Sequence, residues 1–105
     1  MKRQLESELK TAIMKWLRIQ PNTFVWTNIT IGIPNGRGGF RFNFNRGAAD
    51  ICGVKNGRAF AFEVKTVKGK LSPNQEEWLK SFDSAGGYAC VVRDFGSAAE
   101  AWKEV

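Results

Sequence analysis

Residues 50–65 read DICGVKNGRAFAFEVK, and they contain the clearest local folding signal in this chain of 105 residues. The dipeptide Asn56-Gly57 lies near their middle, and Asn-Gly between apolar runs is the strongest short-range sign of a β-hairpin. The sequence therefore predicts two antiparallel strands, over residues 50–54 and 58–67.

The second predicted strand carries two charged side chains among apolar ones. Because side chains alternate faces along a strand, Glu63 and Lys65 share one face while Phe60 and Phe62 share the other. A buried charge is costly unless it is paired or bound to a metal. Pairing about the turn brings Asp50 near Glu63 and Lys65, so two carboxylates and an ammonium group are predicted to converge.

Such a cluster is suited to phosphodiester hydrolysis. Two neighbouring carboxylates repel each other unless a cation lies between them, and Mg²⁺ prefers a few carboxylate oxygens together with water and phosphate oxygens. The metal can activate a water molecule, and the lysine can orient or deprotonate it. The alternative interpretation is a salt-bridge cluster on a solvent-facing sheet edge, because an acid-x-Lys triplet alone is a weak motif.

Further elements are predicted on both sides of the hairpin from helical spacing of apolar residues, helix-capping signals and β-rich runs. They are a helix over 4–18, strands over 24–31 and 40–44 with a loop over 32–39 between them, a helix from Ser72 to Gly86-Gly87, a strand over 88–92 and a helix over 97–103. This order predicts one α/β domain over residues 1–105. We expect a mixed sheet with helices on both faces, in which the strand at 88–92 is parallel to a neighbour.

The amino-acid composition excludes some classes of functional site. The chain contains no histidine, which excludes His-ligated zinc fingers and Ser-His-Asp triads within one chain. Cys52 and Cys90 lie in apolar runs without a CxxC motif and are predicted to be reduced core residues. A net charge of +6 makes nucleic acid a candidate partner, although a protein can be basic without binding nucleic acid.

The sequence also bears on location. No apolar run approaches the roughly 20 residues that span a membrane. The first residues, MKRQLE, lack the apolar core of a signal peptide. An intracellular protein, in the cytoplasm of a host cell, is therefore expected.

Four short motifs follow one another along the chain: GAADI at 47–51, AFEVK at 61–65, GKLSPNQ at 69–75 and AGGY at 85–88. In this order they resemble the VRR-NUC (virus-type replication-repair nuclease) domain of the PD-(D/E)xK superfamily. The resemblance extends to the first helix, where Glu8 precedes Ile13 and Trp16-Leu17 at the family's spacing. The resemblance covers nearly the whole chain and implies a restriction endonuclease-like fold.

This resemblance also implies an active site. It places Glu8, Asp50 and Glu63 around a divalent metal, Mg²⁺ or Mn²⁺, with Lys65 as the catalytic lysine and Gln75 in support. Where the family usually has a proline before the aspartate, this chain has Ala48-Ala49. That departure concerns the geometry of the loop before Asp50.

Two of these assignments stay open when the residues are considered by themselves. Gln75 is explained equally well as the capping-box partner of Ser72 or as a side chain that points into the site. Glu6 and Glu8 both flank the apolar face of the first helix, and only the resemblance selects Glu8.

The function that the resemblance implies is metal-dependent endonuclease hydrolysis of DNA. Stand-alone members of the family are linked to phage-like replicons, resemble enzymes that resolve four-way (Holliday) junctions, and tend to be homodimers. Branched DNA is therefore the expected substrate. The alternatives are a non-specific duplex or nicking endonuclease, a DNA-binding module without catalysis, and a structural interaction domain.

Basic and aromatic residues suggest where partners bind. The Gly-rich loop region and the catalytic strand carry candidate phosphate contacts, namely Arg37, Arg41, Arg46, Lys55, Lys68 and Lys70. The pattern around the loop is explained equally well by a hairpin whose aromatic side chains point inward and whose arginines point into solvent. For a dimer interface we expect the segment 24–44, because the chain has more large aromatics than a small core need bury. These are Phe24, Trp26, Phe40, Phe42, Phe44 and, outside that segment, Trp102.

Overall fold

The computed structural model describes residues 5–28, 33–34, 40–41 and 47–105, with the pairs 33–34 and 40–41 described by their backbone alone. Its centre is a four-stranded sheet in the order β1-β4-β5-β6. The strands are β1 (Thr23–Thr27), β4 (Ile51–Lys55), β5 (Arg58–Val64) and β6 (Tyr88–Val92). β1 and β5 each pair antiparallel with β4, whereas β6 is parallel to β5.

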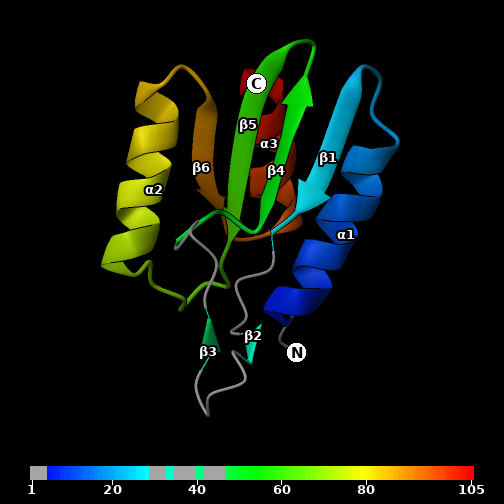
Figure 1. Cartoon of the computed structure of the whole chain (residues 1–105). Coiled ribbons are helices and arrows are strands. Elements are labelled where there is room, and N and C mark those ends of the chain that lie inside the picture. The colour runs from blue at the N-terminus through cyan, green and yellow to red at the C-terminus, as the bar shows by residue number, and fades with distance from the viewer. Residues whose placement is uncertain (1–4, 29–32, 35–39, 42–46) are drawn as a thin grey trace.

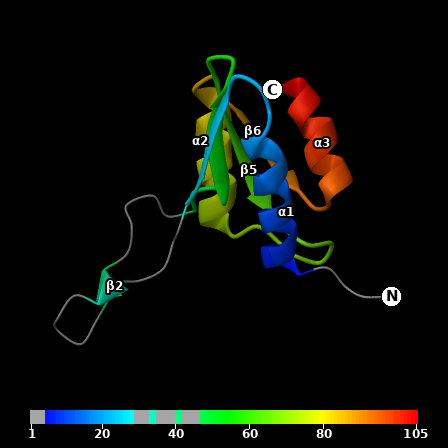
Figure 2. The same ribbon diagram turned by 90° about the vertical axis from the view of Figure 1, so that its right-hand side faces the viewer.

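Helices cover both faces of the sheet. α1 (Glu6–Arg18) and α3 (Phe95–Glu104) lie on one face, and α2 (Pro73–Ser84) lies on the other, beside β6 (Figures 1 and 2). The predicted mixed sheet with helices on both faces is confirmed. A second antiparallel pair, β2 (Ile33–Pro34) and β3 (Phe40–Arg41), lies beyond one end of this sheet.

The Asn-Gly hairpin is also confirmed. Asn56 and Gly57 have φ angles of 49° and 83°, and positive φ at both central positions is the requirement of the type I′ turn. The turn fixes the register of the two strands, in which Lys55 faces Arg58 and Ile51 faces Phe62.

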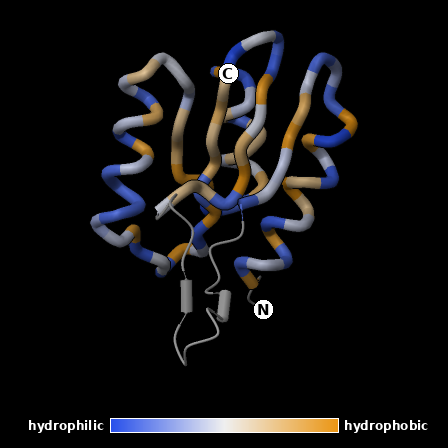
Figure 3. The backbone as a smooth tube through the Cα atoms, viewed as in Figure 1, coloured by the Kyte–Doolittle hydropathy of each residue, from blue (hydrophilic) through white to orange (hydrophobic). Residues whose placement is uncertain are grey.

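The main core fills the space between the sheet and helices α1 and α3. Phe60, Phe62 and Val64 of β5 are fully buried there. Trp102 of α3 packs edge-on against both phenylalanine rings and is 7% exposed, so the monomer core accommodates it without a partner. Hydrophobic residues accordingly concentrate along the central strands, whereas α2 is largely hydrophilic (Figure 3).

A smaller apolar cluster lies under α2. It consists of Ala49, Cys52, Ala61 and Leu79. Both cysteines are free thiols, Cys52 buried and Cys90 partly buried, in line with the predicted reduced core residues. Burial raises the pKa of the Cys90 thiol to about 11, so it is not an activated nucleophile.

Several predicted element ends shift. β5 ends at Val64 rather than at 67, because a turn follows in which the Gly69 N–H donates to the Thr66 carbonyl over 2.9 Å. α3 begins at Phe95 rather than at 97, because Asp94 accepts from the Ser97 N–H and caps the helix.

The connection between β1 and β4 also differs from the prediction. β1 covers 23–27 of the predicted strand 24–31, and residues 29–32 lie outside the described part of the chain. β2 forms a strand inside the predicted loop over 32–39, because its backbone pairs with β3. β3 covers only 40–41 of the predicted strand 40–44. Within the described residues, none of the helices has the length and apolar character that crossing a membrane requires.

Candidate active site

Two carboxylates meet at the end of the sheet that lies opposite the Asn-Gly turn. Asp50 directly precedes β4, and Glu63 is next to the last residue of β5. Because Ile51 pairs with Phe62, the next antiparallel position sets Asp50 opposite Glu63. The Asp50 carboxylate is fixed there by the Val64 N–H, which donates to its Oδ2 over 2.9 Å.

Glu63 is almost completely buried, with 2% of its surface exposed. Its Oε1 accepts a hydrogen bond from the Gln75 amide over 3.3 Å. Its Oε2 is buried and has no hydrogen-bond partner among the described residues. Leaving a buried polar group unsatisfied costs about 1–3 kcal/mol, and more when it is charged, so this oxygen is a natural ligand for a proton or a cation.

The electrostatics of Asp50 and Glu63 also favour binding of a proton or a cation at Glu63. Burial, reinforced by the neighbouring Asp50 carboxylate, raises the pKa of Glu63 to about 8 from its ordinary value of 4.5. The Lys65 ammonium group opposes this rise. Without a bound cation, this surrounding therefore favours the neutral, protonated form of Glu63.

The donor chemistry of the pair fits Mg²⁺ or Mn²⁺. Within residues 5–28 and 47–105, no group of three or more His, Cys, Asp or Glu side chains could hold a metal by itself. Two carboxylates are nevertheless sufficient for Mg²⁺, which is commonly held by one or two of them together with water and substrate phosphates. The unpartnered Oε2 of Glu63 supplies the free donor that such a site needs.

Gln75 has both of the roles that the sequence left open. Its Oε1 accepts from the Ser72 N–H over 2.9 Å, and its own N–H donates to the Ser72 hydroxyl, which completes a capping box at the start of α2. Its Nε2 donates to Glu63. One side chain thus starts the helix and holds the carboxylate.

Lys65 lies directly after β5 and next to Glu63. Its backbone N–H donates to the Val92 carbonyl over 3.0 Å, which extends the pairing with β6 by one residue. A Cβ on Gly69 would lie 3.2 Å from the Lys65 Cδ, so the stem of the lysine packs against the Gly69 backbone. Lys68 and Lys70 are exposed on the same loop.

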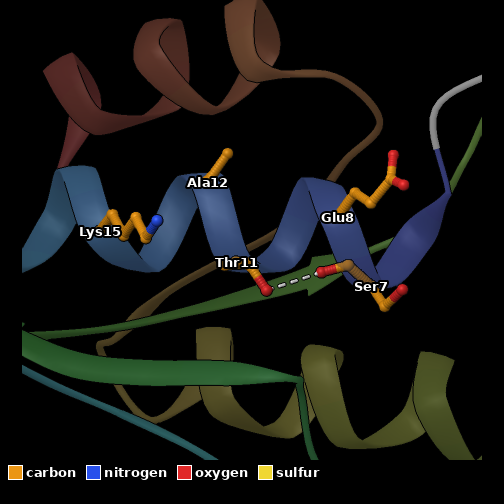
Figure 4. A pocket seen from close by; sticks show the side chains of 5 residues that line it. All are labelled: Ser7, Glu8, Thr11, Ala12 and Lys15. Carbon is orange, nitrogen blue, oxygen red and sulfur yellow. Dashed lines mark hydrogen bonds between the residues drawn. The ribbon is translucent and has the colours of Figure 1, made fainter.

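The structure does not bring Glu8 to this cluster. Glu8 caps its own helix, with Oε2 accepting from the Leu5 N–H over 3.4 Å. It lines a surface pocket with Ser7, Thr11, Ala12 and Lys15, all on α1 (Figure 4). The expectation that Glu8 binds the metal therefore does not fit the register of α1.

Glu6, and not Glu8, is the acid of α1 whose charge reaches Glu63, although among the described residues it does not complete a three-carboxylate metal group with Asp50 and Glu63. It precedes the buried Ile13 by seven residues and Leu9 by three, so it lies on the face of α1 that is turned toward the sheet. Its negative charge contributes to the raised pKa of Glu63. Both acids flank the apolar stripe in the sequence, and only the packing of the helix distinguishes them.

The other basic candidates divide into two groups. Arg37 and Arg46 lie outside the described residues, and Arg41 is described by its backbone alone. Lys55 lies on the opposite face of the sheet, where its Nζ donates to the Trp102 carbonyl over 2.7 Å and lies over that ring. Lys55 is therefore a structural contact of α3 and not part of the site.

Two residues near the site were not recognised from the sequence. Asn28, which was assigned to a strand, donates to the Ala49 carbonyl beside Asp50. Arg93 donates to the carbonyls of Thr66 and Gly69 in the loop after Lys65. Both act through backbone carbonyls that are distant in sequence, and no local pattern marks such contacts.

This arrangement of strands and helices has a solved counterpart. The chain superimposes on a "VRR_NUC domain protein" with a TM-score of 0.71 over 97% of this chain and 88% of that one, at 18% sequence identity. The chain has the VRR_NUC fold. It is a restriction endonuclease-like α/β fold, as the sequence predicted. No protein-family model and no curated protein matches the sequence, so the likeness to the VRR_NUC structure is one of fold.

Proposed function

We propose that this chain is a Mg²⁺- or Mn²⁺-dependent endonuclease that hydrolyses DNA phosphodiester bonds. The observation that carries the proposal is the buried Glu63 carboxylate, whose Oε2 has no partner among the described residues and which lies opposite Asp50. Most buried polar side-chain atoms in folded proteins have a hydrogen-bond partner, and a bound cation would account for the unpartnered oxygen of Glu63. The VRR_NUC fold supports the same class of activity.

Each residue of the cluster has a role in this reaction. Asp50 and Glu63 would hold the metal ion, which supplies Lewis-acid stabilisation of the charge on the phosphate. The Lys65 ammonium group orients the attacking water and neutralises charge that develops on the phosphate oxygens. Gln75 keeps the Glu63 carboxylate in place, and it does so from the rigid first turn of α2.

Branched DNA, such as a four-way junction, is the substrate that we propose. A net charge of +6 favours binding to a polyanion. The exposed Lys68 and Lys70 lie on the loop between β5 and α2, where they can contact DNA phosphates near the site. Resolving a junction requires two cuts, and a homodimer with two-fold symmetry would supply two sites.

Cleavage assays test this proposal directly. The purified protein is incubated with linear, nicked, flapped and four-way DNA, each with Mg²⁺, with Mn²⁺ and with a chelator. We expect metal-dependent nicking that is fastest on the four-way substrate and absent with the chelator. Equal cleavage of all substrates would indicate a non-specific nuclease. Binding without cleavage under every metal condition would indicate a DNA-binding module and contradict the proposed activity.

A further inference from the structure

The residues directly before Asp50 form a short segment held from two sides. Gly47 has φ +81°, and a Cβ placed on it would lie 2.3 Å from the Asn74 carbonyl oxygen at the start of α2. The segment is thus pressed against α2 so closely that only glycine fits. Ala48 and Ala49, which follow, are both buried.

The other side of this segment is held by Asn28, the first residue after β1. Its backbone N–H donates to the Asp50 carbonyl over 2.9 Å. Its side-chain Nδ2 donates to the Ala49 carbonyl over 2.8 Å and contacts the Cys52 sulfur at 3.2 Å. A single asparagine therefore bonds to the carbonyls of two consecutive residues, the second of which is Asp50.

Loss of the hydrogen bond to the Ala49 carbonyl would be energetically unfavourable. Ala49 is fully buried, so water cannot replace the amide if its carbonyl loses that partner. A buried carbonyl without a partner is energetically unfavourable, and the segment would move to relieve that cost. Any such movement displaces Asp50, the next residue.

The sequence explains why a side chain is needed for this task. A proline before Asp50 would fix the backbone φ angle by its ring. Ala48-Ala49 carries no such restriction. The Asn28 amide restricts the same backbone from outside, through a residue that lies 21 positions away from Ala49.

We propose that Asn28 is a positioning residue, which fixes the Asp50 carboxylate in the geometry needed for metal binding by clamping the Ala49 carbonyl. This inference rests on the proposed function for its metal-binding consequence. Its structural part stands independently, because the hydrogen bond from the Val64 N–H to the Asp50 Oδ2 reports where that carboxylate lies.

The first test therefore uses the metal-free protein. In Asn28→Ala, we expect exchange of the Val64 amide, followed by NMR, to accelerate about tenfold or more, because opening of its bond to Asp50 becomes easier. The neighbouring Lys65 amide, which donates to Val92, is the internal control and should change by less than about twofold. Equal acceleration of both amides would indicate general loosening and overturn the positioning role.

The second test measures Mn²⁺ affinity by the loss of the free-ion EPR signal and by the metal dependence of cleavage. We expect Asn28→Ala to raise the Mn²⁺ concentration at half-saturation by about tenfold or more, as loss of a supporting contact around a metal site does. Cys52→Ala removes only the sulfur contact and should stay within about twofold of the wild type.

Asn28→Thr should behave as Asn28→Ala does, because its hydroxyl is too short to replace the amide. It takes the place of Asn28→Ala in both tests if the alanine variant does not fold. Unchanged Val64 exchange and unchanged Mn²⁺ affinity in a folded Asn28 variant would overturn the positioning role alone. Absence of Mn²⁺ binding by the wild type would contradict the proposed function, whereas the exchange measurement would still decide whether Asn28 fixes Asp50.

Discussion

Glu63 is the residue on which the proposed metal site depends most. The β5 strand carries it into an apolar layer, where desolvation and the Asp50 carboxylate disfavour its charged form. The protein thus contains a carboxyl group whose neutral form is favoured, and a cation bound at the proposed site would have to replace its proton. Part of the metal's binding free energy is spent on releasing that proton, so metal affinity should increase with pH.

The raised pKa of Glu63 predicts a pH-dependent stability of the metal-free protein. The folded-state pKa of about 8 lies above the ordinary value of 4.5, so the unfolded state releases this proton more readily. The stability contributed by the neutral group is complete below about pH 4.5 and is lost as pH rises through about 8. Relative to Glu63→Gln, the wild-type free energy of unfolding should fall by up to a few kcal/mol over this range.

Urea unfolding at about pH 5, 6.5 and 8.5 in chelator measures this difference. Glu63→Gln is the matched control, because its amide is neutral at every pH. Parallel stability curves for the two proteins would show that Glu63 titrates normally in the folded state.

The catalytic assignment makes a separate prediction for the three charged residues. Asp50→Asn, Glu63→Gln and Lys65→Ala should each reduce cleavage by about a thousandfold or more, since each removes charge from the reacting phosphate's surroundings. DNA binding in the absence of metal should remain within about tenfold of wild type. Lys70→Ala, on the same loop, is the control for a general loss of positive charge. Wild-type cleavage by Glu63→Gln would contradict the mechanism.

The two glutamates of α1 should also behave differently. Glu6→Gln removes a negative charge that helps to raise the pKa of Glu63, and it lies on the sheet-facing side of the helix. It should change the metal concentration for half-maximal cleavage severalfold. Glu8→Gln alters only the outer face and should be nearly silent. Metal titrations of both variants decide the matter, and a larger effect of Glu8→Gln would show that the helix is rotated from its position in this structure.

At the level of elements, the loop between β5 and α2 connects the catalytic strand to the helix that holds Glu63. Arg93, just after β6, spans this loop with hydrogen bonds to the Thr66 and Gly69 carbonyls over 2.9 and 2.7 Å. Gly69 in turn packs against the stem of Lys65. The loop is therefore an ordered connection whose position determines where Lys65 points.

Removing this support should loosen the loop without unfolding the sheet. In Arg93→Ala we expect trypsin to cleave after Lys68 and Lys70 about tenfold faster, because local opening precedes proteolysis. The cleavage rate on DNA should fall more than the affinity for DNA. Arg58→Ala is the control, since Arg58 donates to the Glu104 carbonyl away from the site. Equal trypsin rates for Arg93→Ala and the wild type would show that the loop is held by other contacts.

The same elements show how far the sequence could predict the fold. Asn56-Gly57, the Ser72–Gln75 capping box and the alternation along β5 are local signals, and the hairpin, α2 and the convergence of Asp50 with Glu63 follow from them. The register of α1 against the sheet depends on packing between distant residues, and for this reason the sequence could not separate Glu6 from Glu8. Asn28 and Arg93 bond to distant carbonyls and were not recognised for the same reason.

At the scale of the whole molecule, the helices cover the sheet unevenly and leave apolar surface exposed on one edge strand. α2 lies beside β6 and leaves the edge strand β1 uncovered on that face of the sheet (Figure 1). Two large aromatic side chains of β1 are exposed. Phe24 is 71% exposed and Trp26 is 42% exposed, and their rings are 5.9 Å apart. Aromatic side chains bury roughly 150–250 Å² each, so this pair offers roughly 200 Å² of apolar surface.

That surface predicts the interface of the proposed homodimer. A standard interface buries about 800 Å² on each partner, so Phe24 and Trp26 would form its apolar centre and surrounding surface would supply the rest. The expected solution mass is twice 11.8 kDa, measured by light scattering at micromolar concentration. The double variant Phe24→Ser/Trp26→Ser should shift it to the monomer mass, because aromatic anchors at an interface centre carry most of its binding free energy. Val67→Ser replaces an apolar side chain that is 82% exposed elsewhere on the surface, and it should leave the mass of the dimer unchanged.

The proposed dimer would also link the interface to catalysis, which gives the prediction a second measurement. Each site cuts one strand, so the monomeric double variant should still nick a four-way junction but should make the two opposed cuts in separate binding events. Nicked intermediates would then accumulate, whereas the wild type would convert junctions to paired products within one encounter. A wild-type mass of 11.8 kDa together with paired cutting would contradict the dimer and would require a single chain to reposition between the two strands.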